Sequence, residues 1–109
     1  MVYMLLKYRI KEGELETVIK NIKDFLYAVH EQEPDTIRYE VFQEKDKLTF
    51  THVMLFRDQT GEHYHSNTAH FKEFGNNLLQ YCVEGPTFSD LIFIGTSENL
   101  DWMQSPDRV

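Results

Sequence analysis

Cysteine and basic residues are both scarce in this chain, and each scarcity excludes a class of protein. The one cysteine, Cys82, cannot form an intramolecular disulfide, so nothing indicates a disulfide-stabilised scaffold. Lysine and arginine number 11 against 18 aspartates and glutamates, which gives a net charge of −7. An acidic surface repels phosphate backbones and anionic lipid headgroups. We therefore expect neither nucleic acid nor a membrane as a partner.

Long apolar runs and cofactor motifs are missing as well. The apolar stretch over residues 1–10 is far too short to span a bilayer, and it lacks the basic segment and the cleavage site of a signal peptide. A cytoplasmic location is the resulting expectation. There is no glycine-rich phosphate-binding motif, and no Cys, His and carboxylate set has a recognised metal spacing. The sequence therefore predicts neither a metal nor a cofactor.

What the chain does contain suits one small α+β domain. Its 109 residues are 41% hydrophobic and 14% aromatic, enough for a modest core. Alternating and helical apolar periods predict six main elements. Strands are expected over residues 2–10, 36–44, 48–56 and 87–96, and helices over 13–33 and 69–82, with a short helical turn over 58–65. Pro34 ends the first helix and Thr68 is the expected N-cap of the second. Residues 1–96 then form the domain and 97–109 a polar C-terminal tail.

The element order β-α-β-β-α-β predicts a ferredoxin-like fold, an antiparallel sheet with both helices on one face. The third and fourth strands, however, are apolar on both faces. Val53 and Leu55 oppose Met54 in one strand, and Phe93 opposes Ile94 in the other. Because large apolar patches are rare on monomers, the open face needs a cover. A second copy of the sheet is the simplest cover, which predicts a homodimer.

Several short motifs follow one another along this frame. Residues 33–40 read EPDTIRYE, residues 56–58 read FRD, residues 65–71 read HSNTAHF, and Gly85-Pro86 precedes the last predicted strand. In this order and spacing they resemble the antibiotic biosynthesis monooxygenase family, over about residues 2–96. The resemblance implies a dimeric α+β barrel that oxidises a quinol or a hydroxylated aromatic compound with O₂ and no prosthetic group. Two positions depart from the family pattern: Met54 stands where an acidic residue is frequent, and Ala69 replaces a proline. Haem-degrading relatives carry a first-strand asparagine and a tryptophan near the second helix, and this chain has neither.

Histidine is the natural base near neutral pH, because its ordinary pKa is about 6.5. His65 and His70 stand where the family has its own histidines, so they are the expected catalytic residues. One of them would take a proton from the substrate or bind its oxygen. Each also has a structural interpretation: His65 can cap a short helix, and His70 can pack in the first turn of the next one.

Six further residues are expected to bind the substrate. They share either a position in the family motifs or a place on an apolar face: His52, Tyr39, Arg38, Asn67, Phe71 and Phe74. Structural roles compete for each of them. A histidine on an apolar strand face is commonly a hydrogen-bonded core residue. Arg38 can pair with Glu40 on the same strand face, and phenylalanines at helical spacing usually fill a core.

Two other functions remain open at this level. An isomerase acting on a small hydroxyketone could use the same histidine pair as acid and base, and it would need an arginine-lined phosphate site, for which only Arg38 and Arg57 are candidates. A non-catalytic, ligand-binding dimer is the third possibility, and Met54 in place of the strand acid is its best argument. The fold alone does not decide between them.

Overall fold

The computed structural model describes residues 1–104, so residues 105–109 of the predicted tail lie outside the described residues. The described residues form four strands and three α-helices, followed by one short 3₁₀ helix. They are β1 (Val2–Ile10), α1 (Leu15–Gln32), β2 (Thr36–Gln43), β3 (Thr49–Phe56), α2 (Gln59–Ser66), α3 (Ala69–Tyr81), β4 (Cys82–Leu91) and η1 (Asp101–Gln104).

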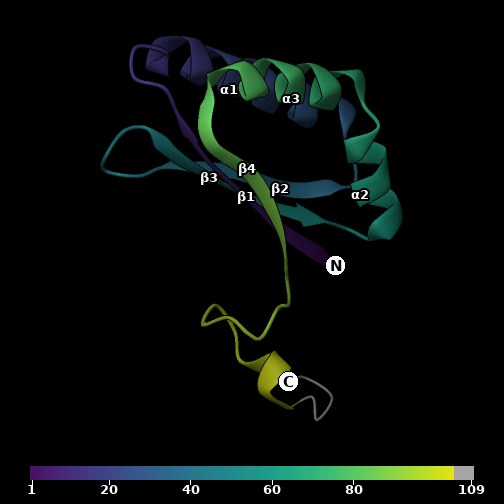
Figure 1. The fold of residues 1–109 in the computed structure, drawn as a ribbon. Coiled ribbons are helices and arrows are strands. Elements are labelled where there is room, and N and C mark those ends of the chain that lie inside the picture. Colours follow the sequence, from purple (N-terminus) through teal and green to yellow (C-terminus); the bar gives the residue numbers. More distant parts are fainter. Residues whose placement is uncertain (105–109) are drawn as a thin grey trace.

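The strands form one antiparallel sheet in the order β2-β3-β1-β4. Helices α1 and α3 lie side by side over one face of the sheet, and α2 stands at one end of it (Figure 1). This arrangement confirms the predicted ferredoxin-like α+β fold. The weakly periodic stretch after β3 forms a full helix, α2, so the order is β-α-β-β-α-α-β. Within residues 1–104, no helix has both the length and the apolarity needed to cross a bilayer.

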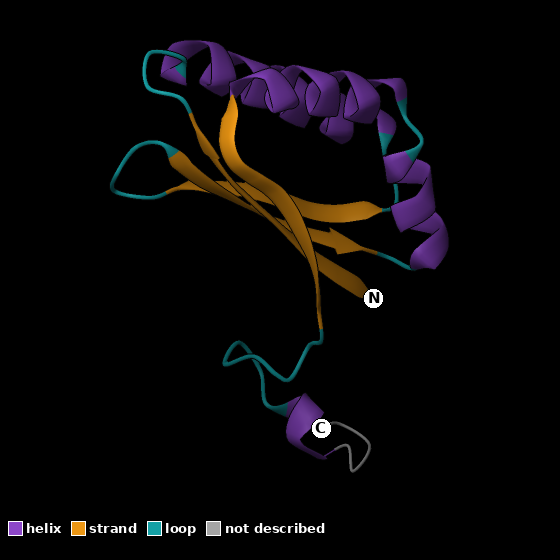
Figure 2. Cartoon of the chain, in the orientation of Figure 1, coloured by secondary structure: helices purple, strands orange, loops and turns teal. Residues whose placement is uncertain are grey.

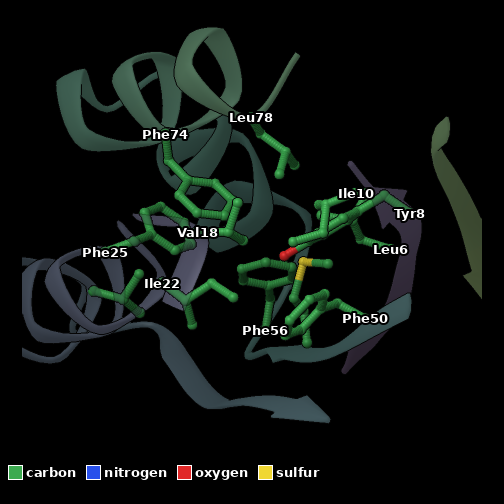
Figure 3. Packing of buried hydrophobic residues seen from close by; sticks show 12 residues of the cluster. Leu6, Tyr8, Ile10, Val18, Ile22, Phe25, Phe50, Phe56, Phe74 and Leu78 are labelled. Carbon is green, nitrogen blue, oxygen red and sulfur yellow. The ribbon is translucent and has the colours of Figure 1, made fainter. Parts of the chain in front are cut away.

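The core lies between the sheet and the two long helices. Alternate residues of β1 and β3 point toward the helices, and the apolar stripe of α1 faces them (Figure 3). Burying each large side chain of this set stabilises the fold by roughly 1.5–3 kcal/mol before the entropy cost is counted. The most buried members are Leu6, Tyr8, Ile10, Val18, Ile22, Phe25, Val29, Phe50, Met54, Phe56, Phe74 and Leu78.

Two side-chain caps place the helices that follow β3. The Thr68 hydroxyl accepts a hydrogen bond from the Phe71 amide at 3.1 Å, as the N-cap prediction requires. The Asp58 carboxylate accepts one from the Gly61 amide at 2.9 Å and so begins α2. At the end of α1, Pro34 prevents further helix and leaves Glu33 as the C-cap residue. These three ends meet at one edge of the core.

The predicted bounds of the last strand were wrong. The sequence predicted residues 87–96, whereas β4 runs from Cys82 to Leu91. The cause is Gly85, which has a φ of +74° and lies where the pairing with β1 shifts register. A Cβ at this position would lie 2.7 Å from the Lys7 carbonyl oxygen. Glycine therefore permits a bulge inside the strand, where the sequence suggested a turn before it.

Beyond Leu91 the chain leaves the body of the domain as an arm, residues 92–104 (Figure 2). Phe93 stacks on Tyr3 with ring centroids 5.6 Å apart. Further out, the Trp102 indole N–H donates to the Thr96 carbonyl at 2.7 Å, which folds the arm back on itself. Ile92 and Ile94 remain exposed on it, at 83% and 56% of their surface.

Candidate functional site

Glu33 is the centre of a buried polar group beneath the ends of α1, α2 and α3. Only 4% of its surface is exposed, and its carboxylate has three hydrogen-bond donors around it. The Thr36 hydroxyl donates to Oε1 at 2.6 Å, His65 Nδ1 lies 2.7 Å from Oε1, and His70 Nε2 lies 2.5 Å from Oε2. One carboxylate thus holds two histidine rings.

The charge state of Glu33 determines what the two rings do. Burial by itself raises the pKa of Glu33, but the hydrogen bonds from His65, Thr36 and His70 outweigh it, so the pKa lies below its ordinary value. Glu33 is therefore ionised near neutral pH and accepts only. On each of the two histidines, the ring nitrogen that faces Glu33 therefore carries a hydrogen and donates a hydrogen bond to the carboxylate.

His65 has an unused nitrogen. The side chain is 2% exposed, and among the described residues its Nε2 has no hydrogen-bond partner. With Nδ1–H donated to Glu33, the neutral form of the ring presents a bare lone pair at Nε2. Four aromatic rings surround it with centroids 5.1–5.9 Å away, those of Phe25, Tyr39, Phe56 and Phe71. A buried polar atom without a partner is unusual and indicates a site for a ligand atom or a water.

A second set of polar side chains, linked by hydrogen bonds through His52, crosses the core. Its Nε2 lies 2.7 Å from the Tyr8 hydroxyl, and its Nδ1 lies 2.9 Å from the Tyr39 hydroxyl. No part of His52 is exposed, and burial lowers its pKa to about 3. The ring is therefore neutral across the physiological range. Burial also raises the pKa of both tyrosines, so their hydroxyls keep their protons.

Two cavities share the stacked pair Phe25 and Phe74 as a wall, with ring centroids 4.6 Å apart. The first, of about 370 Å³, lies between α1 and α3 and has polar lining that includes His70 and Glu73. The second, of about 400 Å³, lies between α3 and the sheet and is mostly apolar. Its lining residues are Leu6, Phe25, Tyr39, Phe71, Lys72, Phe74, Gly75, Asn76, Leu78, Leu79, Pro86 and Phe88.

The structure brings several of the predicted site residues together. Tyr39, Phe71 and Phe74 line the apolar cavity. His65 contacts the rings of Tyr39 and Phe71 but lines neither cavity itself. His70 shares Glu33 with His65 and lines the polar cavity. Aromatic walls of this kind are typical of pockets that hold flat ligands.

Three predicted residues lie elsewhere. Arg38 is exposed on the sheet face that the helices do not cover, because it alternates with the inward Tyr39. Asn67 is exposed at the end of α2, where its side-chain amide donates to the His63 carbonyl at 2.7 Å. His52 lines neither cavity, and both of its ring nitrogens are hydrogen-bonded to tyrosine hydroxyls. It reaches the apolar cavity only through Tyr39.

Sequence reasoning missed Glu33 and Tyr8. Glu33 was visible only as part of a motif before Pro34, and its burial depends on how three helix ends meet. Tyr8 was visible as one more residue on the apolar face of β1. Its hydroxyl matters only because His52 lies on the neighbouring strand β3. Within residues 1–104, no cluster of three or more His, Cys, Asp or Glu side chains could hold a metal ion.

Comparison with known proteins identifies the family. The model of the antibiotic biosynthesis monooxygenase family matches residues 1–77. The chain belongs to this family. No curated protein matches it.

Among solved structures, one of an antibiotic biosynthesis monooxygenase superposes with a TM-score of 0.80 at 17% identity, covering 87% of this chain and all of the other. A conserved protein from Methanosarcina mazei gives a TM-score of 0.76 at 19% identity, covering 83% of this chain and 89% of the other. A candidate antibiotic biosynthesis monooxygenase from Nitrosomonas europaea gives a TM-score of 0.77 at 14% identity, covering 87% of this chain and 100% of the other. Identities this low support the fold only.

Proposed function

We propose that this family member is a cofactor-independent monooxygenase that oxidises a quinol or a hydroxylated aromatic compound with O₂. One observation carries the proposal: a histidine held by a buried carboxylate presents an unpartnered Nε2 directly behind the aromatic wall of an apolar cavity. The cavity volume of about 400 Å³ suits a ligand of one to three fused rings. A base must come within hydrogen-bond reach of the phenol that it deprotonates. Because His65 lines neither cavity, the proposal requires the Tyr39 and Phe71 rings to shift when the ligand binds.

The reaction balances without a further reductant. A quinol and O₂ give a hydroxyquinone and one water. Four electrons leave the quinol, two of which reduce the inserted oxygen atom and two the oxygen atom that becomes water. His65 Nε2 takes the hydroxyl proton, and the resulting phenolate passes one electron to O₂. The two radicals combine into a C–O bond, and the protonated histidine returns its proton to the peroxide. Loss of the ring hydrogen and cleavage of the O–O bond then release water.

The Glu33 carboxylate has two jobs in this scheme. It fixes the tautomer of His65 so that Nε2 is bare, and its charge stabilises the imidazolium that forms when the proton arrives. His70 is the second candidate base, because it shares the same carboxylate and is 12% exposed toward the polar cavity. The isomerase alternative gains nothing from the structure. Arg38 is exposed on the far sheet face, Arg57 pairs with Asp35, and neither lines the apolar cavity.

Oxygen consumption by metal-stripped protein tests this function. With a panel of dihydroxynaphthalenes and quinols, the wild type should consume O₂ faster than autoxidation does. His65→Ala should lower the rate by roughly 10²- to 10⁴-fold, and added imidazole should restore part of it. His63→Ala is the matched control, because this exposed histidine is on the same helix and outside the Glu33 group. A loss confined to His70→Ala would assign the base to His70 instead, and no uptake from any compound would refute the proposed activity.

We also propose that the protein is a homodimer. Leu5 and Val53, each partly exposed, lie on the sheet face that the helices leave uncovered, and the arm beyond β4 carries exposed isoleucines. The radius of gyration of 15.4 Å exceeds the ~13 Å of a compact chain of this length, since the arm extends from the body. A second copy would cover both surfaces. Sedimentation at micromolar concentration should give twice the chain mass of 13.0 kDa, and a monomeric mass would contradict the proposal.

A further inference from the structure

The direction of the hydrogen bonds in the Tyr8–His52–Tyr39 chain is not arbitrary. A neutral imidazole has one donor nitrogen and one acceptor nitrogen, so exactly one tyrosine donates to His52 and the other accepts from it. Within residues 1–104, each tyrosine hydroxyl has its only hydrogen bond to His52. The two directions therefore differ in which hydroxyl proton is left without an acceptor.

The surroundings of the two tyrosines decide between these directions. Tyr8 is 2% exposed and stacks on Phe50. It lines neither cavity beside the core helices, and although it borders a cavity of about 340 Å³ between β1 and β4, its side chain remains buried. If His52 donated to Tyr8, the Tyr8 O–H would be buried without an acceptor, which is costly. Tyr39 is also mostly buried, but it forms part of the wall of the apolar cavity. A ligand in that cavity is therefore a candidate acceptor for the Tyr39 O–H.

We propose that Tyr8 donates to His52 Nε2, that His52 Nδ1–H donates to Tyr39, and that Tyr39 presents its O–H to a carbonyl or phenolate oxygen of the ligand. Tyr39 is then a ligand-binding donor, and Tyr8 and His52 are positioning residues that do not touch the ligand. The donor strengthens as charge develops on the ligand oxygen, as it does when a phenol loses its proton. Donation along the chain polarises each successive hydroxyl.

This assignment rests on the proposed function only where it names the ligand. It also makes the site complementary to a ligand that carries two different oxygen groups. Tyr39 offers a proton to one oxygen from the cavity wall. His65 Nε2, which lies behind that wall, offers a lone pair to a hydroxyl once the wall opens to the ligand; the two ring centroids are 5.7 Å apart. A flat ring that carries both an acceptor oxygen and a hydroxyl would satisfy both. A hydrocarbon of the same shape would satisfy neither, so the cavity should discriminate between them.

The tautomer of His52 can be measured without any ligand. Two-bond ¹H–¹⁵N correlations distinguish a protonated ring nitrogen from a bare one, and a His52→Gln variant assigns the signals. We expect the proton on Nδ1 in the wild type. In Tyr8→Phe, part of the population should move to Nε2–H, while Tyr27→Phe, changed at an exposed position of α1, should leave the tautomer unchanged. A wild-type proton on Nε2 would overturn the proposal, and an unchanged tautomer in Tyr8→Phe would show that Tyr8 does not set the direction.

Ligand titration completes the test and separates the two hypotheses. The probes are α-tetralone, a bicyclic aromatic ketone, and tetralin, the matching hydrocarbon. The wild type should prefer the ketone by roughly 3- to 10-fold in Kd, and Tyr39→Phe should abolish that preference while it keeps the affinity for tetralin. Equal affinity of the wild type for both probes would refute the role of Tyr39 but would still support the cavity as a binding site for aromatic ligands. Binding of neither probe would refute the cavity and the proposed function together.

Discussion

Acidification from pH 6.5 to pH 3 should destabilise this protein by roughly 4 kcal/mol through His52 alone. Burial lowers the pKa of His52 from 6.5 to about 3. Between these values the unfolded chain binds a proton at this position and the folded chain does not, so the free energy of unfolding falls as the pH falls. Urea unfolding at several pH values measures the effect.

His52→Gln should remove most of this pH dependence, because glutamine can bond to both tyrosine hydroxyls and does not titrate. Its control is His30→Gln, changed at an exposed position in the last turn of α1. The control should keep the wild-type slope. If His52→Gln unfolded with the same pH dependence as the wild type, His52 would not be the buried neutral group described above.

Replacement of Glu33 is the other change with a large expected effect. Glu33→Gln keeps the shape of the side chain but removes the charge that accepts from Thr36, His65 and His70, and it turns an amide N–H₂ toward donors. Loss of a buried, fully bonded carboxylate costs roughly 2–4 kcal/mol in unfolding free energy. Urea unfolding at pH 7 is the measurement.

The matched variant is Glu31→Gln, two residues earlier and exposed, which should change stability by less than about 0.5 kcal/mol. Glu33→Gln should also impair oxygen consumption, since it releases the tautomer of His65. The wild-type stabilisation by Glu33 has its own pH signature. Because its folded pKa lies below the unfolded value, that stabilisation is complete above the unfolded pKa and is lost as the pH falls through the folded one. A Glu33→Gln variant as stable as the wild type would mean that the carboxylate does not organise the site.

Most of the fold could be predicted from periodicity and caps. The stripe along α1, the Thr68 cap and the alternation in β1 and β3 all appear in the structure as predicted. The start of β4 could not be predicted, because a Gly-Pro pair usually marks a turn. Only the close approach of Lys7 shows that Gly85 belongs to a bulge within the strand.

The site was less accessible from sequence. The place of His65 and His70 in a motif made them candidate residues, but the carboxylate that joins them was not predicted, since nothing local marks Glu33 as buried. Its partners lie 32 and 37 residues away along the chain. The sequence placed Arg38 and Tyr39 on opposite faces of one strand, and only the packing of the helices shows that Tyr39 is the one that lines the cavity.

Isotope labelling with ¹⁸O₂ tests the central claim most directly. Metal-stripped protein is incubated with the quinol that supports the fastest oxygen consumption, and the product is analysed by mass spectrometry. A monooxygenase should place one ¹⁸O atom in each hydroxyquinone molecule and the other in water, and His65→Ala should lower the yield of labelled product by roughly 10²- to 10⁴-fold. A product without ¹⁸O, or an equal yield of labelled product from the wild type and from His65→Ala, would contradict this function.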